Sequence, residues 1–425
     1  MRRLAVTAML AACGGGETKS DGGGGDGGDP PLVGCPALAA PSGTVVQVGA
    51  GDNLAQLVFD AAPGTTFVLA DGTYTLATTI QVHVPGVAIR SAADDASRVT
   101  LDAGYVVAEA IQVSAPDVTI AHVTITHAVD HAIHVTPPDG GPDVTGFVMY
   151  GVTLADNGEQ FLKVNPPAAR DAFVDGGRVE CSRFVMTDAG RPHVERDPGG
   201  CYTGGIDVHS ARGWVVRQNR FDGIFCAGEG LAEHAIHFWV SGRDTLVENN
   251  VIVDCARGIG FGLGDAGNGF TRTYSDDPYP GVGYVGHYDG IIRNNAIWAS
   301  VPYYDTGISL EQARGARVYH NTVVSADSAT GFFSSIDYRF TNSVVELANN
   351  LTRRITQRDG ATATLTTNLE STDLAPFVDA AGGDLHLTAG AAAAIDQGTA
   401  VGDAGLDLDG EPHTRGAPDL GADER

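Results

Sequence analysis

A short alternation of apolar and polar positions recurs through most of the chain. It runs Ile, any residue, an apolar residue, any residue, and its clearest copies begin at Ile206, Ile236, Ile259, Ile308 and Ile336. Looser copies begin upstream at Ile111, Ile133 and Leu162. A period of two places alternate side chains on opposite faces of a β-strand. The pattern therefore predicts many short strands, each with one apolar face and one polar face.

A second phrase is centred on asparagine. It places Asn between two short apolar stretches, at spacings of 31, 45, 26 and 29 residues, at Asn219, Asn250, Asn295, Asn321 and Asn350. A repeat of roughly 20 to 50 residues marks a solenoid, in which each unit buries its apolar face against the next. One Asn at the same point of each repeat predicts a ladder of stacked amides, with Ser182 in that position one coil earlier. Such a ladder indicates an all-β fold, the right-handed parallel β-helix.

The solenoid brings the polar positions of successive strands into line. Equivalent positions stack, so the polar positions form two columns on one face of the solenoid, and we expect both columns to face solvent. The first column reads Gln112, His134, Lys163, Asp207, His237, Gly260, Ser309 and Asp337. The second column reads Ser114, Thr136, Asn165, His209, Trp239, Gly262, Glu311 and Arg339.

The start of the solenoid has its own character. Residues 54–61 are predicted as a short capping helix that begins after Asn53 and stops at Pro63-Gly64. The strand-turn-strand passage that follows, residues 66–74, resembles the N-terminal cap of pectate-lyase-like β-helices. The resemblance implies that superfamily for nearly all of the mature chain.

Four segments follow from these patterns. Residues 1–13 are predicted as a signal peptide with a lipobox, 14–42 as a flexible Gly-rich tether, 43–370 as the β-helix and 371–425 as a C-terminal capping segment. The 45-residue interval in the Asn repeat predicts an insertion at about residues 265–287.

The first residues have the features of an exported lipoprotein. A basic start precedes an apolar run, and Leu10-Ala11-Ala12-Cys13 resembles a bacterial lipobox, so we expect lipidation at Cys13. An ordinary secretory signal is the alternative. Gly14 lacks the acidic retention signal of inner-membrane lipoproteins. We therefore expect an outer-membrane, cell-surface or periplasmic protein of a Gram-negative bacterium, attached to the membrane only through this lipid.

Charge narrows the range of partners. The chain has 52 acidic and 26 basic side chains, a formal net charge of -26. Nucleic-acid binding needs a basic footprint, so the charge argues against a nucleic-acid partner. A polyanionic substrate requires a local basic cleft or bound Ca²⁺. We expect the protein to be a monomer.

Five cysteines remain after Cys13. In an oxidising compartment some of them pair, and the bridges Cys226–Cys255 and Cys181–Cys201 are two possibilities. Free thiols buried in the coil wall are the alternative, because connectivity does not follow from sequence.

The middle of the two columns concentrates chemically active residues. Lys163, Asp207 and His237 follow one another in the first column. Beside them, the second column offers residues for binding a substrate or assisting its chemistry: Asn165, His209, Trp239, Glu311 and Arg339. This mixture of residue types is not required to form a purely structural face of the solenoid. An outward Trp can stack on a sugar ring. The alternative is that these side chains only solvate the face.

A loop before one of these strands adds Glu233 and His234 over the same face. His234 and His237 have the spacing of a metal-binding pair. On a strand, however, an odd spacing places two side chains on opposite faces, so we do not expect this pair to bind a metal.

One local resemblance concerns chemistry. Asn157-Gly158-Glu159, followed by Lys163, is similar to the Asn-Gly-Glu…Lys stretch of the alginate lyase and chondroitinase B family. That resemblance implies Ca²⁺ bound by Asn157 and Glu159, with Lys163 as a catalytic base.

The first functional hypothesis is a polysaccharide lyase that cleaves uronate-containing glycan by β-elimination. This chemistry needs a base for the C5 proton, a neutraliser for the sugar carboxylate and an acid for the leaving oxygen. We expect Lys163 as the base and His209 and His237 as neutraliser or acid. Asp207 is expected to depress the pKa of its basic neighbours, to orient them, or to hold Ca²⁺.

Two other functions fit the same scaffold. A glycoside hydrolase would pair Asp207 with Glu233 or Glu311. A non-catalytic cell-surface glycan-binding protein or adhesin would use the same face without turnover.

Overall fold

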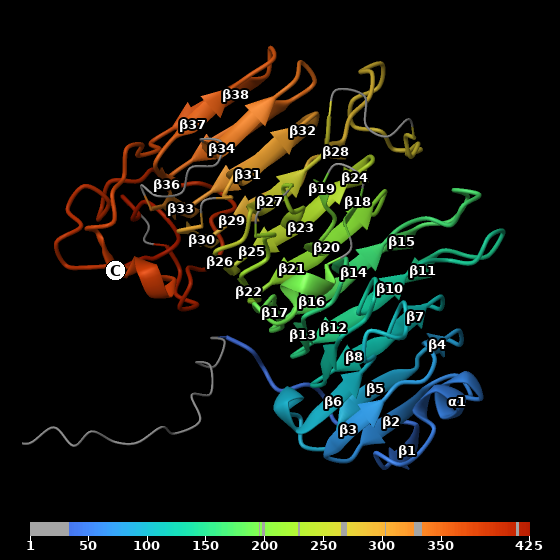
Figure 1. Cartoon of the computed structure of the whole chain (residues 1–425). Coiled ribbons are helices and arrows are strands. Elements are labelled where there is room, and N and C mark those ends of the chain that lie inside the picture. The colour runs from blue at the N-terminus through green and yellow to red at the C-terminus, as the bar shows by residue number, and fades with distance from the viewer. Residues whose placement is uncertain are drawn as a thin grey trace, which may run out of the picture. The chain divides into compact units, whose positions relative to one another are not determined.

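The structure of the protein is a computed structural model that describes residues 34–425, except 195, 198–199, 228–229, 265–269, 302, 327–333 and 414–415. The predicted lipidation site Cys13 and the predicted tether up to residue 33 lie outside the described residues. Short strands joined by turns wind into successive coils, and equivalent strands pair in parallel to form three long sheets (Figure 1). The expected right-handed parallel β-helix is confirmed.

Sheet C contains the strands predicted from the Ile alternation. Its ten strands are β4 (Ile80–Val82), β7 (Ile111–Val113), β10 (Ile133–Val135), β14 (Gln160–Val164), β20 (Gly204–His209), β23 (His234–Trp239), β27 (Arg257–Phe261), β31 (Thr306–Glu311), β34 (Ser334–Arg339) and β37 (Ile355–Gln357). Cα pairing confirms the first column without a break, from Gln112 to Asp337. In the second column, His209 pairs with Trp239 and Glu311 with Arg339. The Ile positions are fully buried, as the period of two requires.

Sheets A and B complete each coil. Sheet A contains β1 (Thr44–Val48), β2 (Thr65–Leu69), β5 (Ala88–Ser91), β8 (Thr119–Ala121), β12 (Val148–Tyr150), β16 (Arg178–Glu180), β21 (Val215–Arg217), β24 (Gly242–Arg243), β25 (Leu246–Glu248), β28 (His287–Tyr288), β29 (Ile291–Arg293), β32 (Ala313–Tyr319), β35 (Val344–Ala348) and β38 (Thr362–Thr366). Sheet B contains β3 (Gly72–Thr75), β6 (Val99–Asp102), β9 (Thr124–Thr126), β13 (Thr153–Ala155), β17 (Arg183–Val185), β22 (Arg220–Asp222), β26 (Val251–Val253), β30 (Ala296–Ala299), β33 (Thr322–Ser325) and β36 (Leu351–Thr352).

Shorter elements lie in the loops between these sheets. Two-stranded pairs are formed by β11 (Val144–Thr145) with β15 (Val174–Asp175), β18 (Arg196–Asp197) with β19 (Gly200–Cys201), and β39 (Phe377–Asp379) with β40 (Asp384–Leu387). Single 3₁₀ turns are η1 (Ala96–Arg98), η2 (Arg191–His193) and η3 (Ala380–Gly382).

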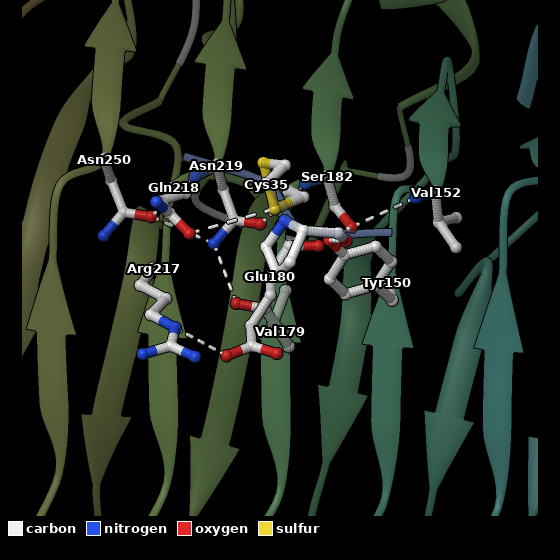
Figure 2. The surroundings of a disulfide bond; sticks show 12 residues. Cys35, Tyr150, Val152, Val179, Glu180, Ser182, Arg217, Gln218, Asn219 and Asn250 are labelled. Atoms are coloured by element: carbon white, nitrogen blue, oxygen red, sulfur yellow. Dashed lines mark hydrogen bonds and ion pairs between the residues drawn. A yellow bond between two sulfur atoms is a disulfide. The ribbon is translucent and has the colours of Figure 1, made fainter. Parts of the chain in front are cut away.

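The asparagine ladder is confirmed at the turn from sheet A to sheet B. The Asn219 amide donates to Asn250 Oδ1 at 3.0 Å, and the same bond repeats along the predicted rungs. Each amide oxygen also accepts the backbone N–H of the rung before it, so the turn leaves those buried donors satisfied. Ser182 begins this row beside Asn219 (Figure 2). The ladder extends one rung further than the repeat predicts, to Asn368.

The N-terminal end is closed as expected. Helix α1 (Leu54–Phe59) is capped by the Asn53 side chain, which accepts from the backbone of Gln56 at 3.2 Å. The helix ends before the predicted residue 61. Its apolar side, including Val58, packs into the main core.

Residues 35–39 are fixed to sheet A, although they fall within the predicted tether. Cys35 forms a disulfide with Cys181 beside the ladder (Figure 2). The Tyr150 hydroxyl donates to the carbonyl of Pro36, and Arg90 Nη1 donates to the carbonyl of Ala39 at 2.6 Å. A tether that reaches away from the β-helix therefore ends by Cys35.

Both disulfide pairings considered from the sequence are wrong. The structure pairs Cys35 with Cys181 and Cys201 with Cys226, and leaves Cys255 as a buried thiol. The Cys201–Cys226 bridge joins two loops that leave neighbouring coils, and loop positions do not follow the repeat.

The C-terminal segment packs against the outer face of sheet B. Ile297 of β30 and Val323 of β33 lie in the main core. Their neighbours Trp298 and Val324 lie on the opposite face and form a second hydrophobic cluster with Phe377, Leu385 and Leu387. The outward face of those strands is apolar because this segment covers it.

The predicted insertion lies between β27 and β28, and its described part contributes Tyr274 and Val285 to a small cluster with Tyr288. Among the described residues, the helices lack the length and apolar character that crossing a bilayer requires.

Candidate functional site

Asp207 lies at the centre of a group of polar side chains on the outer face of sheet C. Its Oδ2 forms an ion pair with Lys163 Nζ and lies 3.2 Å from His209 Nε2. Its Oδ1 accepts the indole N–H of Trp239 at 2.6 Å and lies 4.0 Å from His237 Nδ1. We call these five residues, together with Tyr202, the Asp207 cluster.

The sequence places five of these six residues correctly in two neighbouring columns. Lys163, Asp207 and His237 come from β14, β20 and β23 in the first column, and His209 and Trp239 come from the second. Parallel pairing in register is sufficient to bring them together.

Tyr202 is not predicted from the sequence as a member of this cluster. It follows the Cys201–Cys226 bridge, and its hydroxyl lies 3.5 Å from Lys163 Nζ. The one feature of the sequence that points to Tyr202 is the neighbouring Cys201, and the pairing of that cysteine does not follow from the sequence. Burial raises the pKa of Tyr202 above 10. The charge of Lys163 lowers this pKa, and the nearby carboxylates of Asp207 and Glu159 raise it further.

The expectation that the first column faces solvent is wrong for the central residues. Lys163, Asp207 and His237 are 8%, 4% and 1% exposed. A buried charge needs partners that replace its contacts with water. Here the three side chains contact one another, and loops cover them. Tyr202, His209 and Trp239 are partly exposed and form the edge of the cluster that a solute can reach.

The charge states within the cluster follow from this burial. Burial opposes ionisation of Asp207, but Lys163 and His209 outweigh it and hold the pKa of that carboxyl well below 3.8. Burial also lowers the pKa of Lys163, but Asp207 and Tyr202 outweigh it and raise that pKa above 10.5. Asp207 therefore does not depress the pKa of Lys163, as one alternative expected; it orients an ammonium group.

Trp239 contacts three other residues of the Asp207 cluster. Its ring is parallel to that of His237 at a centroid distance of 5.4 Å and meets His209 edge-on at 4.4 Å. With its N–H on Asp207, the indole fixes the orientation of the cluster. Stacking on a sugar remains a prediction for the part of the ring that is exposed.

Asn165 belongs to a second polar chain and follows β14, the strand of Lys163, one coil before Asp207. Its Oδ1 lies 2.7 Å from His134 Nε2, and His134 Nδ1 lies 2.5 Å from Glu109 Oε1. Burial raises the pKa of Glu109, but the bond and charge of His134 outweigh it, so the pKa is lowered. Glu109 lies outside the Ile alternation and was not singled out from the sequence.

The predicted Ca²⁺ ligands do not form a Ca²⁺ site. Asn157 is 1% exposed, its Oδ1 accepts from the backbone of Ala128 at 3.0 Å, and its amide donates to the carbonyl of Ala155 at 3.1 Å. Glu159 lies 3.4 Å from His131 Nε2. Ca²⁺ needs six to eight oxygen ligands, and here the one amide oxygen is committed to the backbone. The implied ion does not fit these residues.

Glu311 and Arg339 lie downstream of the Asp207 cluster. Glu311 is three coils beyond Asp207, a separation of about 14 Å at about 4.8 Å per coil. Burial raises the pKa of Glu311, which accepts from the backbone of Gly264 at 2.6 Å. Arg339 forms an ion pair with Asp359 at 2.7 Å.

His234 and His237 do not lie on opposite faces, so that expectation is wrong. Their ring centroids are 4.3 Å apart, and Glu233 Oε2 lies 3.9 Å from His234 Nδ1. His234 is the first residue of β23 and precedes the Ile alternation, which begins at Ile236, so the predicted alternation does not extend to it.

No match to the sequence is found among protein-family models or curated proteins. Among solved structures, the chain is similar to the pectate lyase Pel9A, with 14% identity and a TM-score of 0.56 over 90% of this chain and 97% of that protein. It is also similar to an alginate lyase from Paenibacillus sp. str. FPU-7, with 17% identity and a TM-score of 0.51 over 76% of this chain and 99% of that one.

A surface adhesin of Streptococcus pneumoniae, PfbA, matches with 12% identity and a TM-score of 0.46 over 75% of this chain and 84% of that one. At their low identities the two lyase structures show the pectate-lyase-like parallel β-helix fold, as the sequence predicts, and the fold alone.

Proposed function

We propose that the protein is a polysaccharide lyase that cleaves uronate-containing glycan by β-elimination at the Asp207 cluster. The observation that carries the proposal is that a buried, charged Lys163 and a partly exposed His209 meet on one carboxylate. An ammonium group attracts a uronate carboxylate, and an oriented imidazole is suited to proton transfer.

His209 is the base in this proposal. Its Nε2 lies 3.2 Å from Asp207 Oδ2, which only accepts, and 3.4 Å from Lys163 Nζ, and the closer carboxylate favours hydrogen on Nε2 when the ring is neutral. Its Nδ1 then keeps the lone pair, and no described residue forms a hydrogen bond to Nδ1. This is the arrangement in which a carboxylate orients an imidazole for proton abstraction.

The reaction can then be written step by step. The C5 proton passes to His209 Nδ1, and the electron pair of the C5–H bond forms the C4–C5 double bond. The C4–O bond breaks, and its oxygen takes a proton from the Tyr202 hydroxyl. Solvent then returns a proton to Tyr202 and accepts the C5 proton from His209, so both side chains regain their starting states. The Lys163 ammonium stabilises the negative charge that develops on the uronate carboxylate.

This assignment differs from the one expected from sequence, in which Lys163 is the base. The pairing with Asp207, which keeps Lys163 charged, supports the role of neutraliser. Lys163→Arg separates the two roles, because arginine keeps the charge and does not act as a base. We expect Lys163→Arg to retain measurable turnover and Lys163→Met to lose it; loss in both would return the base to Lys163.

The hydrolase that pairs Asp207 with Glu311 is disfavoured by distance. Paired glycosidase carboxyl groups lie about 5 to 9.5 Å apart, against the separation of about 14 Å that three coils impose. Pairing of Asp207 with Glu233 remains as an outcome of the test below.

The test is a panel of uronate polymers, including polygalacturonate, mannuronan, guluronan and glucuronans, incubated with the purified protein. A lyase generates products with a conjugated double bond, which absorb in the near ultraviolet, and new reducing ends in equal number. Reducing ends without that absorbance would show hydrolysis instead. Binding without either product would show a glycan-binding protein.

A further inference from the structure

Three potential metal ligands converge beside the Asp207 cluster. One carboxylate oxygen of Glu233 and one nitrogen each of His234 and His237 lie within 4.8 Å of one another. Carboxylate and imidazole together are typical ligands of Zn²⁺ and neighbouring transition metals, at bond lengths of about 2.0–2.2 Å. Small side-chain movements bring such a set around one ion.

His234 supplies an observation that points to a ligand. The residue is 3% exposed, and its Nδ1 has no hydrogen-bond partner. Its Nε2 is held by Ser309 Oγ at 2.8 Å, so Nδ1 is the nitrogen aimed at Glu233 and available to a metal. A buried polar atom without a partner costs about 1–3 kcal/mol, which a bound cation would remove.

His237 also has one ring nitrogen held from behind, while its Nδ1 lies 4.0 Å from Asp207 Oδ1. Its Nε2 lies 3.0 Å from the carbonyl of Gly262, which only accepts, so Nε2 carries the hydrogen and Nδ1 keeps its lone pair. Metal-binding histidines commonly have their second nitrogen held by such a partner.

Gly260 makes room for the two rings. It occupies the first column directly after His237, where other coils present a side chain. A Cβ at Gly260 would lie 2.7 Å from His234 Nε2 and 2.9 Å from His237 Cδ2. A residue of any other type would therefore displace both imidazoles.

The surrounding charges leave room for a cation. Arg257 Nη1 lies 3.6 Å from Glu233, but the Arg257 guanidinium also pairs with Asp305 at 3.0 Å. On the other side, Asp207 is paired with Lys163. The neighbourhood thus contains three carboxylates and two cationic side chains.

We propose that Glu233, His234 and His237 bind one divalent transition-metal ion of the Zn²⁺ type. The site adjoins the Asp207 cluster and shares His237 with it. The proposed lyase steps use none of these three side chains, so the metal proposal does not depend on them. It selects against Ca²⁺, because two of its three ligands are imidazole nitrogens. Ser309 and Gly262 fix the two rings from behind.

The test uses the purified, chelator-treated protein and Co²⁺ as a spectroscopic probe of the site. We expect one Co²⁺ per chain with visible d–d absorption, displaced by Zn²⁺ and unchanged by excess Ca²⁺. Glu233→Gln keeps the size of a partly exposed side chain and is expected to weaken binding at least 10-fold. Ser309→Ala is expected to weaken it by about 10- to 100-fold, as loss of a supporting partner does elsewhere.

His386→Ala is the matched control. His386, Asp409 and Asp423 form the other His- and carboxylate-containing group that lies close enough to hold an ion among the described residues. Unchanged Co²⁺ binding in His386→Ala, with loss in His234→Ala, supports the proposal. No stoichiometric binding by the parent protein, or binding lost in His386→Ala and retained in Glu233→Gln, overturns it. Thermal unfolding of each variant shows whether a loss reflects a damaged fold.

Discussion

At the scale of single residues, Asp207 determines the state of the candidate site. Lys163, His209 and Trp239 all meet this one carboxylate. Sequence alone places these residues in adjacent column positions, because strand register follows from the repeat. It does not show that loops bury them, nor that Tyr202 joins them, because loop conformation is independent of the repeat.

The Lys163–Asp207 pair gives a prediction at this scale. The chain has only two lysines, Lys19 and Lys163, so ¹³C-labelled lysine should give two NMR signals, which Lys163→Met assigns. We expect Lys163 to titrate above 10.5 in the parent protein, because Asp207 outweighs burial. In Asp207→Asn only burial and weaker partners remain, so the pKa of Lys163 should fall below its parental value. An unchanged titration of Lys163 would contradict the pairing.

At the scale of elements, the asparagine ladder fixes the turn from sheet A to sheet B. Its rungs from Asn219 to Asn350 are predictable because their spacing and surroundings repeat. Asn368 is missed because the last coil is short, with only 18 residues after Asn350. The disulfides join a terminal segment and loops, so they lie outside anything that the period predicts.

The ladder makes its own prediction for stability. Asn295→Ala removes an amide that serves both neighbouring rungs and leaves buried backbone groups without partners. At about 1–3 kcal/mol for each buried group left unsatisfied, we expect a loss of about 3 kcal/mol or more in the free energy of unfolding. Asn368→Ala, at the partly buried last rung, should cost clearly less. Equal losses in denaturant unfolding would contradict this account of the ladder.

At the scale of the whole molecule, the period of the sequence accounts for the three sheets and the central core. The period does not account for the segments that cover these sheets, which are the C-terminal segment on sheet B and the loops on sheet C. Several histidines are buried in the folded protein. Burial lowers the pKa of His131 to about 4 and the pKa values of His287 and His320 to about 3.

These histidines predict acid sensitivity of the fold. In the unfolded chain they take up protons near pH 6.5, whereas the folded chain keeps them neutral, so unfolding takes up protons below that pH. Their contribution to stability is complete above about pH 6.5 and is lost progressively toward pH 3. We expect the melting temperature to fall already between pH 6.5 and 5, before most carboxyl groups titrate. A constant or rising melting temperature over that interval would contradict the neutral state of these rings.

The central claim is that the Asp207 cluster carries out β-elimination with His209 as its base. The most direct measurement is the rate at which unsaturated product appears from the uronate polymer that the parent protein cleaves, compared between His209→Ala and His386→Ala. His386 also pairs with a carboxylate, Asp384, at 2.6 Å, but lies in the C-terminal segment. Because a positioned base contributes about 10²- to 10⁴-fold, we predict at least a 100-fold loss in His209→Ala and a near-parental rate in His386→Ala. A near-parental rate in His209→Ala, or no unsaturated product from any uronate polymer, would contradict the account.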